Sequence, residues 1–147
     1  MQKIEIYDTT LRDGSQGAGI SFSLEEKLII TKILDDLGVD FIEGGWPGSN
    51  PKDELYFKKV KEVPLKNAKI AAFSSTRRKG TLPHEDFFLQ QMADSNADCY
   101  CIFGKSWDRQ VLEALNVSLD ENLLMIKDSI EYLKKETGRP IFFDCEH

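Results

Sequence analysis

Cysteine and histidine are scarce in this sequence of 147 residues, which contains three cysteines and two histidines. The cysteines, Cys99, Cys101 and Cys145, are odd in number and lack C-x-x-C spacing. This pattern argues against a disulfide framework or a zinc site and predicts reduced thiols. Cys99 and Cys101 are two residues apart, so on a strand they share a face, where we expect them to be buried as small apolar side chains.

Long apolar runs and dense positive charge are also missing. No apolar run approaches the roughly 20 residues of a membrane span, and the first residues lack the apolar segment of a signal peptide. The formal net charge is -6, without the clustered Lys and Arg that mark a nucleic-acid surface. We therefore expect a cytoplasmic protein that binds neither membrane nor nucleic acid. The 41% of hydrophobic residues is typical of one globular unit with a core.

Strand-like and helix-like segments alternate along the chain. Five short apolar runs predict strands at residues 4–7, 39–43, 69–73, 98–103 and 140–147. A helix is predicted after each strand but the last, and the strand ends recur about every 30 to 40 residues, which is typical of parallel βα units. Polar and glycine-rich residues follow each strand, as expected when ligands bind at the C-terminal ends of parallel strands.

Capping patterns give the helices their expected limits. A capping box of Ser23 and Glu26 predicts a helix that ends at Gly38, and Asn50-Pro51 predicts the start of the next. A third helix is expected from about residue 84 to 92, a short one over 107–115 capped by Ser106, and a long one from a second capping box, Ser118 and Glu121, to Gly138. Gly44 and Gly45 predict a loop.

Two α/β folds are compatible with five such strands. One is an open doubly wound sheet, and the other is part of a TIM (β/α)8 barrel. We favour the barrel because side chains suited to function follow several strands. A barrel typically needs about 250 residues, so residues 1–147 are expected to form a single incomplete (β/α)8-barrel domain, with five strands and four βα units, truncated after the fifth strand.

The first strand end carries the motif Arg12-Asp13-Gly14-x-Gln16. Asp13 can hold a divalent cation through oxygen, while Arg12 can hydrogen-bond the carbonyl or carboxylate of a metal-bound acid. Gly14 allows a tight turn over the ligand. A surface Arg-Asp ion pair before a turn is the alternative interpretation of the motif alone.

The strand-end segments resemble a known family. They are Tyr-Asp-Thr-Thr-Leu-Arg-Asp-Gly-x-Gln, Phe-Ile-Glu-Gly-Gly-Trp-Pro-Gly-Ser-Asn-Pro-Lys-Asp, Ser-Thr-Arg-Arg-Lys-Gly, Phe-Gly-Lys-Ser-Trp-Asp and Asp-x-Glu-His. In this order they resemble the citramalate synthase branch of the 2-isopropylmalate synthase family, the metal-dependent DRE-TIM metallolyases. The resemblance covers all 147 residues. It implies an acyltransferase of leucine or isoleucine biosynthesis that condenses acetyl-CoA with a 2-oxo acid, either pyruvate or 2-oxoisovalerate, and that works as a homo-oligomer. As a fragment of such an enzyme, the 147-residue chain itself is expected to lack synthase activity.

The resemblance also implies roles for individual residues. Asp13 resembles the carboxylate ligand of a divalent metal, Mn²⁺ or Mg²⁺ with Zn²⁺ as a possibility, and Arg12 the arginine that polarises the keto oxygen. Gln16 resembles a polar neighbour, Glu43 the carboxylate facing the oxo-acid pocket, and Glu146 a carboxylate near the reacting centre. The family's remaining metal ligands are two residues in an H-x-H or H-x-N motif. The sequence has no such motif, so the metal site is expected to be incomplete.

Several alternatives remain open at this stage. Arg77 and Arg78 are candidates to bind the phosphates of coenzyme A or the oxo-acid carboxylate, or else they balance acids such as Glu85 and Asp86. A hydroxyacyl-CoA lyase could use the same Arg12 and Asp13, because condensation and cleavage share an enolate. A non-catalytic half-barrel that assembles through its strand edges is the third possibility.

Overall fold

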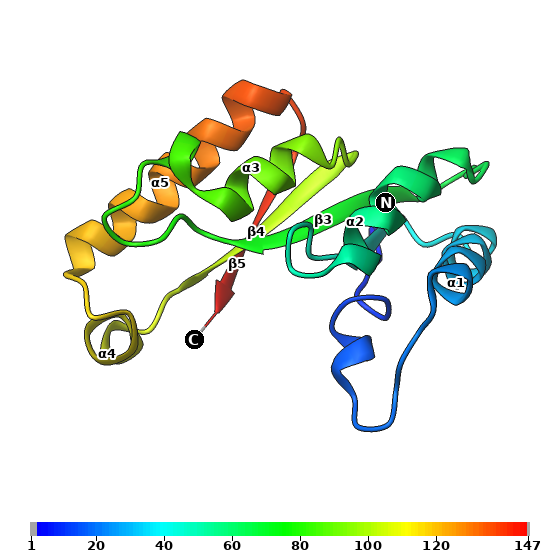
Figure 1. Cartoon of the computed structure of the whole chain (residues 1–147), viewed down its shortest axis with the longest axis horizontal. Helices are drawn as coiled ribbons and strands as arrows, with labels where there is room; N and C mark the ends of the chain where they lie inside the picture. The colour runs from blue at the N-terminus through cyan, green and yellow to red at the C-terminus, as the bar shows by residue number, and fades with distance from the viewer. Residues whose placement is uncertain (1–2, 147) are drawn as a thin grey trace.

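The computed structural model describes residues 3–146, and its sheet has five parallel strands in the order β1-β2-β3-β4-β5 (Figure 1). The strands are β1 (Tyr7–Asp8), β2 (Phe41–Gly45), β3 (Lys69–Ser75), β4 (Cys99–Lys105) and β5 (Ile141–Glu146). This curved sheet is a half-barrel, which confirms the expected α/β barrel architecture.

Helices separate the successive strands. They are α1 (Leu24–Asp36), α2 (Pro51–Lys59), α3 (Phe87–Asp94), α4 (Asp108–Gln110), which continues as a π-helical turn over Val111–Leu115, and α5 (Leu119–Thr137). Short 3-10 turns lie at Gly14–Gln16, Val60–Glu62 and Pro83–Glu85. Among the described residues, no helix combines the length and the apolar character needed to cross a bilayer.

The two faces of the sheet have different surroundings. Side chains such as Ile42, Ile70 and Ile102 point toward the helices and form the main core. Alternate residues point to the inner face of the half-barrel, where a smaller apolar cluster holds Phe41 and Cys99. The structure confirms that Cys99 and Cys101 are buried, since they are 0% and 7% exposed.

Most of the predicted caps are present. Ser23 and Glu26 form the complete capping box of α1, and the Asn50 side chain accepts the Asp53 N–H at the start of α2. Gly38 and Gly138 follow their helices with φ of +86° and +65°, a region that favours glycine. These short-range patterns were read correctly because they depend on neighbours in the sequence.

Three local predictions were wrong. The first strand has only two residues, because the Asp40 carboxylate takes the Ile6 N–H that a longer ladder would use. Ser106 does not cap the short helix, since its hydroxyl donates to the Glu146 carbonyl and Trp107 is the residue before α4. The capping box of α5 is incomplete, because Glu121 pairs with Arg77 instead of turning back to Ser118.

The loop predicted at Gly44 and Gly45 belongs to strand β2. A Cβ on Gly44 would lie 2.1 Å from the Tyr56 ring, and one on Gly45 would lie 2.6 Å from the Asp53 carboxylate. The glycines therefore serve close packing of β2 on α2. The register between β2 and β3 shifts at this point, between Glu43 and Gly45, so the strand end is bulged directly after Glu43.

Candidate active site

The segment after β1 presents Arg12 and Asp13 in a tight turn. The Thr9 carbonyl accepts the N–H groups of Arg12 and Gly14, and Leu11, the residue before Arg12, is fully buried. The Ser15 hydroxyl donates to the Arg12 carbonyl at 2.7 Å. The apolar anchor and the backbone bonds fix the turn, so that the Arg12 side chain extends across the inner face of the sheet.

Arg12 is held against a buried carboxylate on β2. Its Nε donates to Oε1 of Glu43 at 2.5 Å, and the Glu43 side chain is 1% exposed. The other oxygen, Oε2, accepts the Tyr7 hydroxyl at 2.7 Å. Arg12 Nη1 also donates to Asp13 at 3.1 Å. A planar guanidinium with fixed contacts at Nε and Nη1 is suited to orient a bound carbonyl or carboxylate.

Aromatic rings pack against one face of the Arg12 guanidinium. The Arg12 Cζ lies 3.7 Å from the centroid of the Phe73 ring, which stacks on Phe103 with centroids 5.2 Å apart. Trp46 meets both rings edge-on, at 5.7 and 5.8 Å. The cation-π contact holds a charged group in a partly desolvated place without consuming any of its N–H donors.

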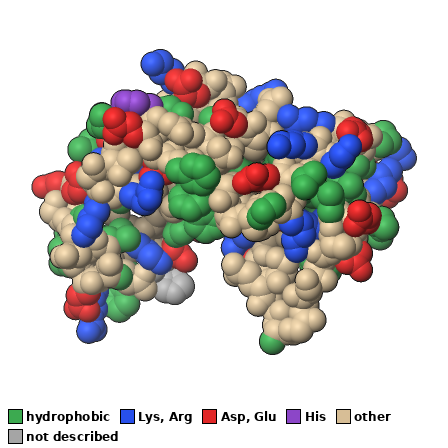
Figure 2. Space-filling model, viewed as in Figure 1, with side chains coloured by type: hydrophobic (Ala, Val, Ile, Leu, Met, Phe, Trp, Pro, Cys, Tyr) green, Lys and Arg blue, Asp and Glu red, His purple; other side chains and the backbone are tan. Residues whose placement is uncertain are grey.

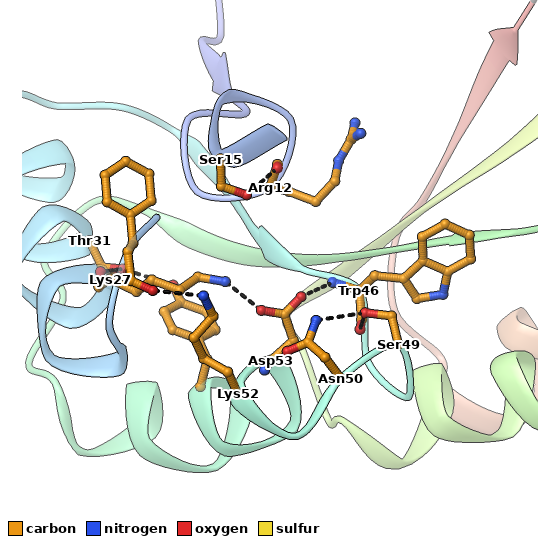
Figure 3. A network of polar contacts seen from close by, with 11 residues as sticks. Arg12, Ser15, Lys27, Thr31, Trp46, Ser49, Asn50, Lys52 and Asp53 are labelled. Atoms are coloured by element: carbon orange, nitrogen blue, oxygen red, sulfur yellow. Dashed lines mark hydrogen bonds and ion pairs between the residues drawn. The ribbon is translucent and has the colours of Figure 1, made fainter. Parts of the chain in front are cut away.

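A buried ion pair fixes the end of β2 (Figure 3). Lys27 of α1 donates to Oδ1 of Asp53 at 2.6 Å, and Oδ2 accepts the Trp46 N–H at 3.0 Å. Burial lowers the pKa of Lys27, and its bond to Asp53 opposes that shift. Figure 3 shows the Arg12 side chain directed away from this pair. The pair therefore supports the site through the backbone that carries Trp46.

Asp13 and Gln16 lie in the solvent-facing part of the turn. The Asp13 side chain is 60% exposed and keeps one ion pair, with Arg12. Gln16 ends the 3-10 turn and is exposed. Both side chains are accessible to a ligand that approaches the inner face.

The last described residue, Glu146, lies at the end of β5. Its carboxylate pairs with Lys105 of β4 at 2.6 Å, and its backbone carbonyl accepts the Ser106 N–H. Asp144, two residues earlier, lines a cavity of about 520 Å³ together with Arg12 and Glu43. Figure 2 shows the molecule hollowed between the α4 segment and the loop after β1. His147, for which no role was expected, lies outside the described residues.

The two candidate arginines after β3 differ in their surroundings. Arg77 is 5% exposed, and its guanidinium pairs with Glu121 and Asp128 at 3.0 Å each, so it ties the loop to α5. Arg78 has a side chain that is 60% exposed and that contacts Asp86 at 3.1 Å. Both line a second cavity, of about 720 Å³. Arg77 therefore has a structural role in joining the loop to α5, whereas the Arg78 side chain is accessible to a ligand.

Three residues at the site were not singled out from the sequence. Tyr7 and Asp144 each lie two residues from another residue that lines the inner cavity, Glu5 and Phe142, and that period of two is the signal that could have found them. Phe73 has no sequence signal, because its contact with Arg12 joins distant parts of the chain. Cys101 also lines the inner cavity, but burial and then the Glu43 charge raise the pKa of its thiol to about 12, so it stays protonated.

The described residues fit a divalent cation only in part. Asp13 supplies an exposed carboxylate of the hard-oxygen type that Mg²⁺ and Mn²⁺ prefer. Across residues 3–146, however, no group of three or more His, Cys, Asp or Glu side chains is placed to hold a metal ion. One carboxylate leaves most coordination positions to water or to other ligands.

Comparison of the sequence with known proteins identifies a family. The family model described as HMGL-like matches residues 3–147. The (R)-citramalate synthase of Geobacter sulfurreducens is 51% identical over 147 residues, which is 100% of this chain and 28% of that protein. The 2-isopropylmalate synthase of Acetivibrio thermocellus is 32% identical over 139 residues, 93% of this chain and 26% of its own length. This chain thus spans less than a third of either relative.

A solved structure shows the same fold at low sequence identity. The hydroxymethylglutaryl-CoA lyase of Pseudomonas aeruginosa superposes with a TM-score of 0.69 at 16% identity, covering 96% of this chain and 46% of that one. The half-barrel thus corresponds to part of a larger fold, and the match of the family model to nearly every residue shows that the chain belongs to the HMGL-like family.

Proposed function

We propose that the protein is an acyltransferase that condenses acetyl-CoA with a 2-oxo acid, as the names of the citramalate and 2-isopropylmalate synthases among its relatives suggest. The observation that carries this proposal is the placement of Arg12. Its guanidinium lies beside the exposed Asp13 carboxylate and is fixed by Glu43 and Phe73. This is the arrangement that a reaction with charge developing on a keto oxygen requires.

The proposed reaction makes one C–C bond and breaks one thioester. A proton leaves the methyl group of acetyl-CoA, the resulting carbanion attacks the keto carbon, and the carbonyl electron pair moves to the keto oxygen. That oxygen takes up a proton, and water then hydrolyses the thioester so that coenzyme A leaves as a thiol. Arg12 donates to the keto oxygen as its charge grows, and Glu146 at the strand end is our candidate for a proton-transfer group.

The other candidate residues bind and orient in this scheme. Glu43 orients Arg12, and the exposed Gln16 is our candidate for an amide contact to the oxo acid. Arg78 is accessible to the phosphates of coenzyme A or to the oxo-acid carboxylate. We propose Asp13 as one ligand of a divalent metal, Mn²⁺ or Mg²⁺ with Zn²⁺ as a possibility, which would supply Lewis-acid polarisation of the keto oxygen.

Release of free thiol tests the proposal. The intact protein is incubated with acetyl-CoA, a divalent metal and either pyruvate or 2-oxoisovalerate, and thiol is measured with a chromogenic disulfide. We expect release that depends on one of the two oxo acids. The absence of release with both, together with cleavage of a hydroxyacyl-CoA, would favour the lyase alternative; the absence of both activities would favour a non-catalytic assembly module.

We also propose that the protein is cytoplasmic and self-associates. The inner face carries an apolar cluster in which Phe41 is buried while Tyr7 and Phe142 are only partly buried, and β1 and β5 are the edge strands of the described sheet. The 147-residue chain is therefore expected to sediment as a dimer or larger species at micromolar concentration. A monomer across that range would contradict this association.

A further inference from the structure

The hydroxyl of Tyr7 has a place at the candidate site that the proposed reaction does not explain. Tyr7 is on β1, and its ring packs against Phe41 with centroids 6.0 Å apart and edge-on against Phe142 at 5.4 Å. These two contacts from β2 and β5 fix the ring plane. The hydroxyl is thereby aimed at Oε2 of Glu43, to which it donates at 2.7 Å.

The bond to Tyr7 decides how many points of contact Glu43 makes with Arg12. The carboxylate has two oxygens, and Arg12 Nε reaches only Oε1. A carboxylate beside an arginine normally favours two parallel bonds, here to Nε and Nη2, which share one edge of the guanidinium. The Tyr7 hydroxyl holds Oε2 in an orientation in which the carboxylate makes a single bond to the guanidinium. Among residues 3–146, Arg12 Nη2 donates to no acceptor.

We infer that Tyr7 is a positioning residue that keeps Glu43 from closing a two-point fork on Arg12 and so leaves Nη2 free to bind the 2-oxo acid. The Arg12 side chain is 17% exposed, and Phe73 covers one face of the guanidinium. Tyr7 stays protonated over the working range, because burial and then the Glu43 charge raise its pKa far above 10. It can therefore donate at every pH at which the protein is folded.

This inference rests on the proposed function, and the Tyr7→Phe substitution tests it. Phenylalanine keeps the ring contacts and removes only the donor, so Oε2 becomes free to turn toward Nη2. We expect KM for the oxo acid to rise about 10- to 100-fold, as for the loss of one charged hydrogen bond, with KM for acetyl-CoA unchanged. The matched control is Tyr56→Phe, which removes a buried hydroxyl bonded to Thr31 on the helix side of the sheet.

A direct structural measurement keeps the test independent of activity. In ¹⁵N spectra of the arginine side chains, Nη2 of Arg12 should exchange freely with solvent in the wild type and become protected in Tyr7→Phe. If the inference is right, a crystal structure of Tyr7→Phe should also show Oε2 of Glu43 within 3.5 Å of Nη2 of Arg12. Tyr56→Phe should leave both readouts as in the wild type.

The outcomes separate this inference from the proposed function. If Tyr7→Phe keeps the wild-type KM and an unprotected Nη2, the inference is wrong even though the synthase activity stands. If the wild type has no activity with any oxo acid but Nη2 becomes protected in the variant, the role of Tyr7 in controlling Arg12 stands and the proposed substrate is wrong. A purely structural Tyr7 would instead lower stability without changing KM or Nη2 protection.

Discussion

The buried pair of Lys27 and Asp53 allows a quantitative prediction for stability, because the two charges have different numbers of other polar partners. The Lys27 side chain is 3% exposed, and its ammonium has one carboxylate partner, Asp53, and the face of the Tyr56 ring at 5.0 Å. The Asp53 side chain is 11% exposed, lies in the first turn of α2 and also accepts the Trp46 N–H.

Removing one partner of a buried ion pair costs about 3 to 5 kcal/mol, because the other charge stays behind. In Lys27→Met, Asp53 keeps a backbone donor and the positive end of the α2 dipole, so we expect the lower cost of about 1 to 3 kcal/mol. In Asp53→Asn, Lys27 loses its carboxylate partner and the Trp46 N–H loses a charged acceptor. That variant should reach the full range of about 3 to 5 kcal/mol.

Urea unfolding followed by tryptophan fluorescence and circular dichroism measures both free energies. The two variants should differ by about 2 kcal/mol, which is about 6 °C in Tm for a chain of this size. The double variant Lys27→Met/Asp53→Asn should be more stable than Asp53→Asn alone, because no unpaired ammonium remains. A Lys27→Met variant as unstable as Asp53→Asn, or a double variant with purely additive losses, would refute this assignment of the charges.

Three further predictions concern Arg12, Asp35 and Arg78. Arg12→Lys should lower kcat/KM in the thiol assay by about 100-fold or more, because lysine lacks the planar two-point donor group of arginine. The control is Arg109→Lys at an exposed position, and equal activity of the two variants would show that Arg12 takes no part in the chemistry. Burial would raise the pKa of Asp35, but the backbone N–H groups of residues 66–68 outweigh it and hold that pKa below 3.8. Its contribution to stability is therefore complete above pH 3.8 and is lost as the pH falls, so stability of Asp35→Asn should depend less on pH in acid than that of the wild type. Arg78→Glu should raise KM for acetyl-CoA or the oxo acid, and unchanged KM values for both would leave Arg78 with only its bond to Asp86.

The sequence predicted the βα order well because that order depends on short-range patterns. Caps such as Ser23 and Asn50 involve residues two or three apart, and the apolar runs mark each strand whatever its neighbours are. The candidate residues Arg12 and Asp13 were found for the same reason, since they form one continuous motif. What they contact could not be predicted in this way, because those contacts join different strands.

Helix α5 shows where periodicity fails. Leu119 and Leu123 are four residues apart, a spacing typical of one apolar helix face, yet they are 46% and 64% exposed. The buried positions include Asn122 and Ser129, because Asn122 donates to the Lys105 carbonyl and Ser129 accepts the Arg77 N–H. A polar side chain can replace an apolar one in the interior only when such partners exist. The partners come from the end of β4 and the loop after β3, which periodicity within the helix does not report.

The glycines after Glu43 illustrate how the supporting structure and the site depend on each other. Read alone, Gly44-Gly45 indicates a loop, whereas in the fold both glycines let α2 approach so closely that Asp53 can bind the Trp46 N–H. The same approach bulges β2 directly after Glu43. The Glu43 carboxylate, which accepts hydrogen bonds from Arg12 and Tyr7, therefore lies next to the part of β2 that the Lys27–Asp53 ion pair fixes from the helix side. A site that must hold a guanidinium at Nε and leave Nη2 free needs that rigidity, since a carboxylate able to shift could turn its second oxygen to Nη2.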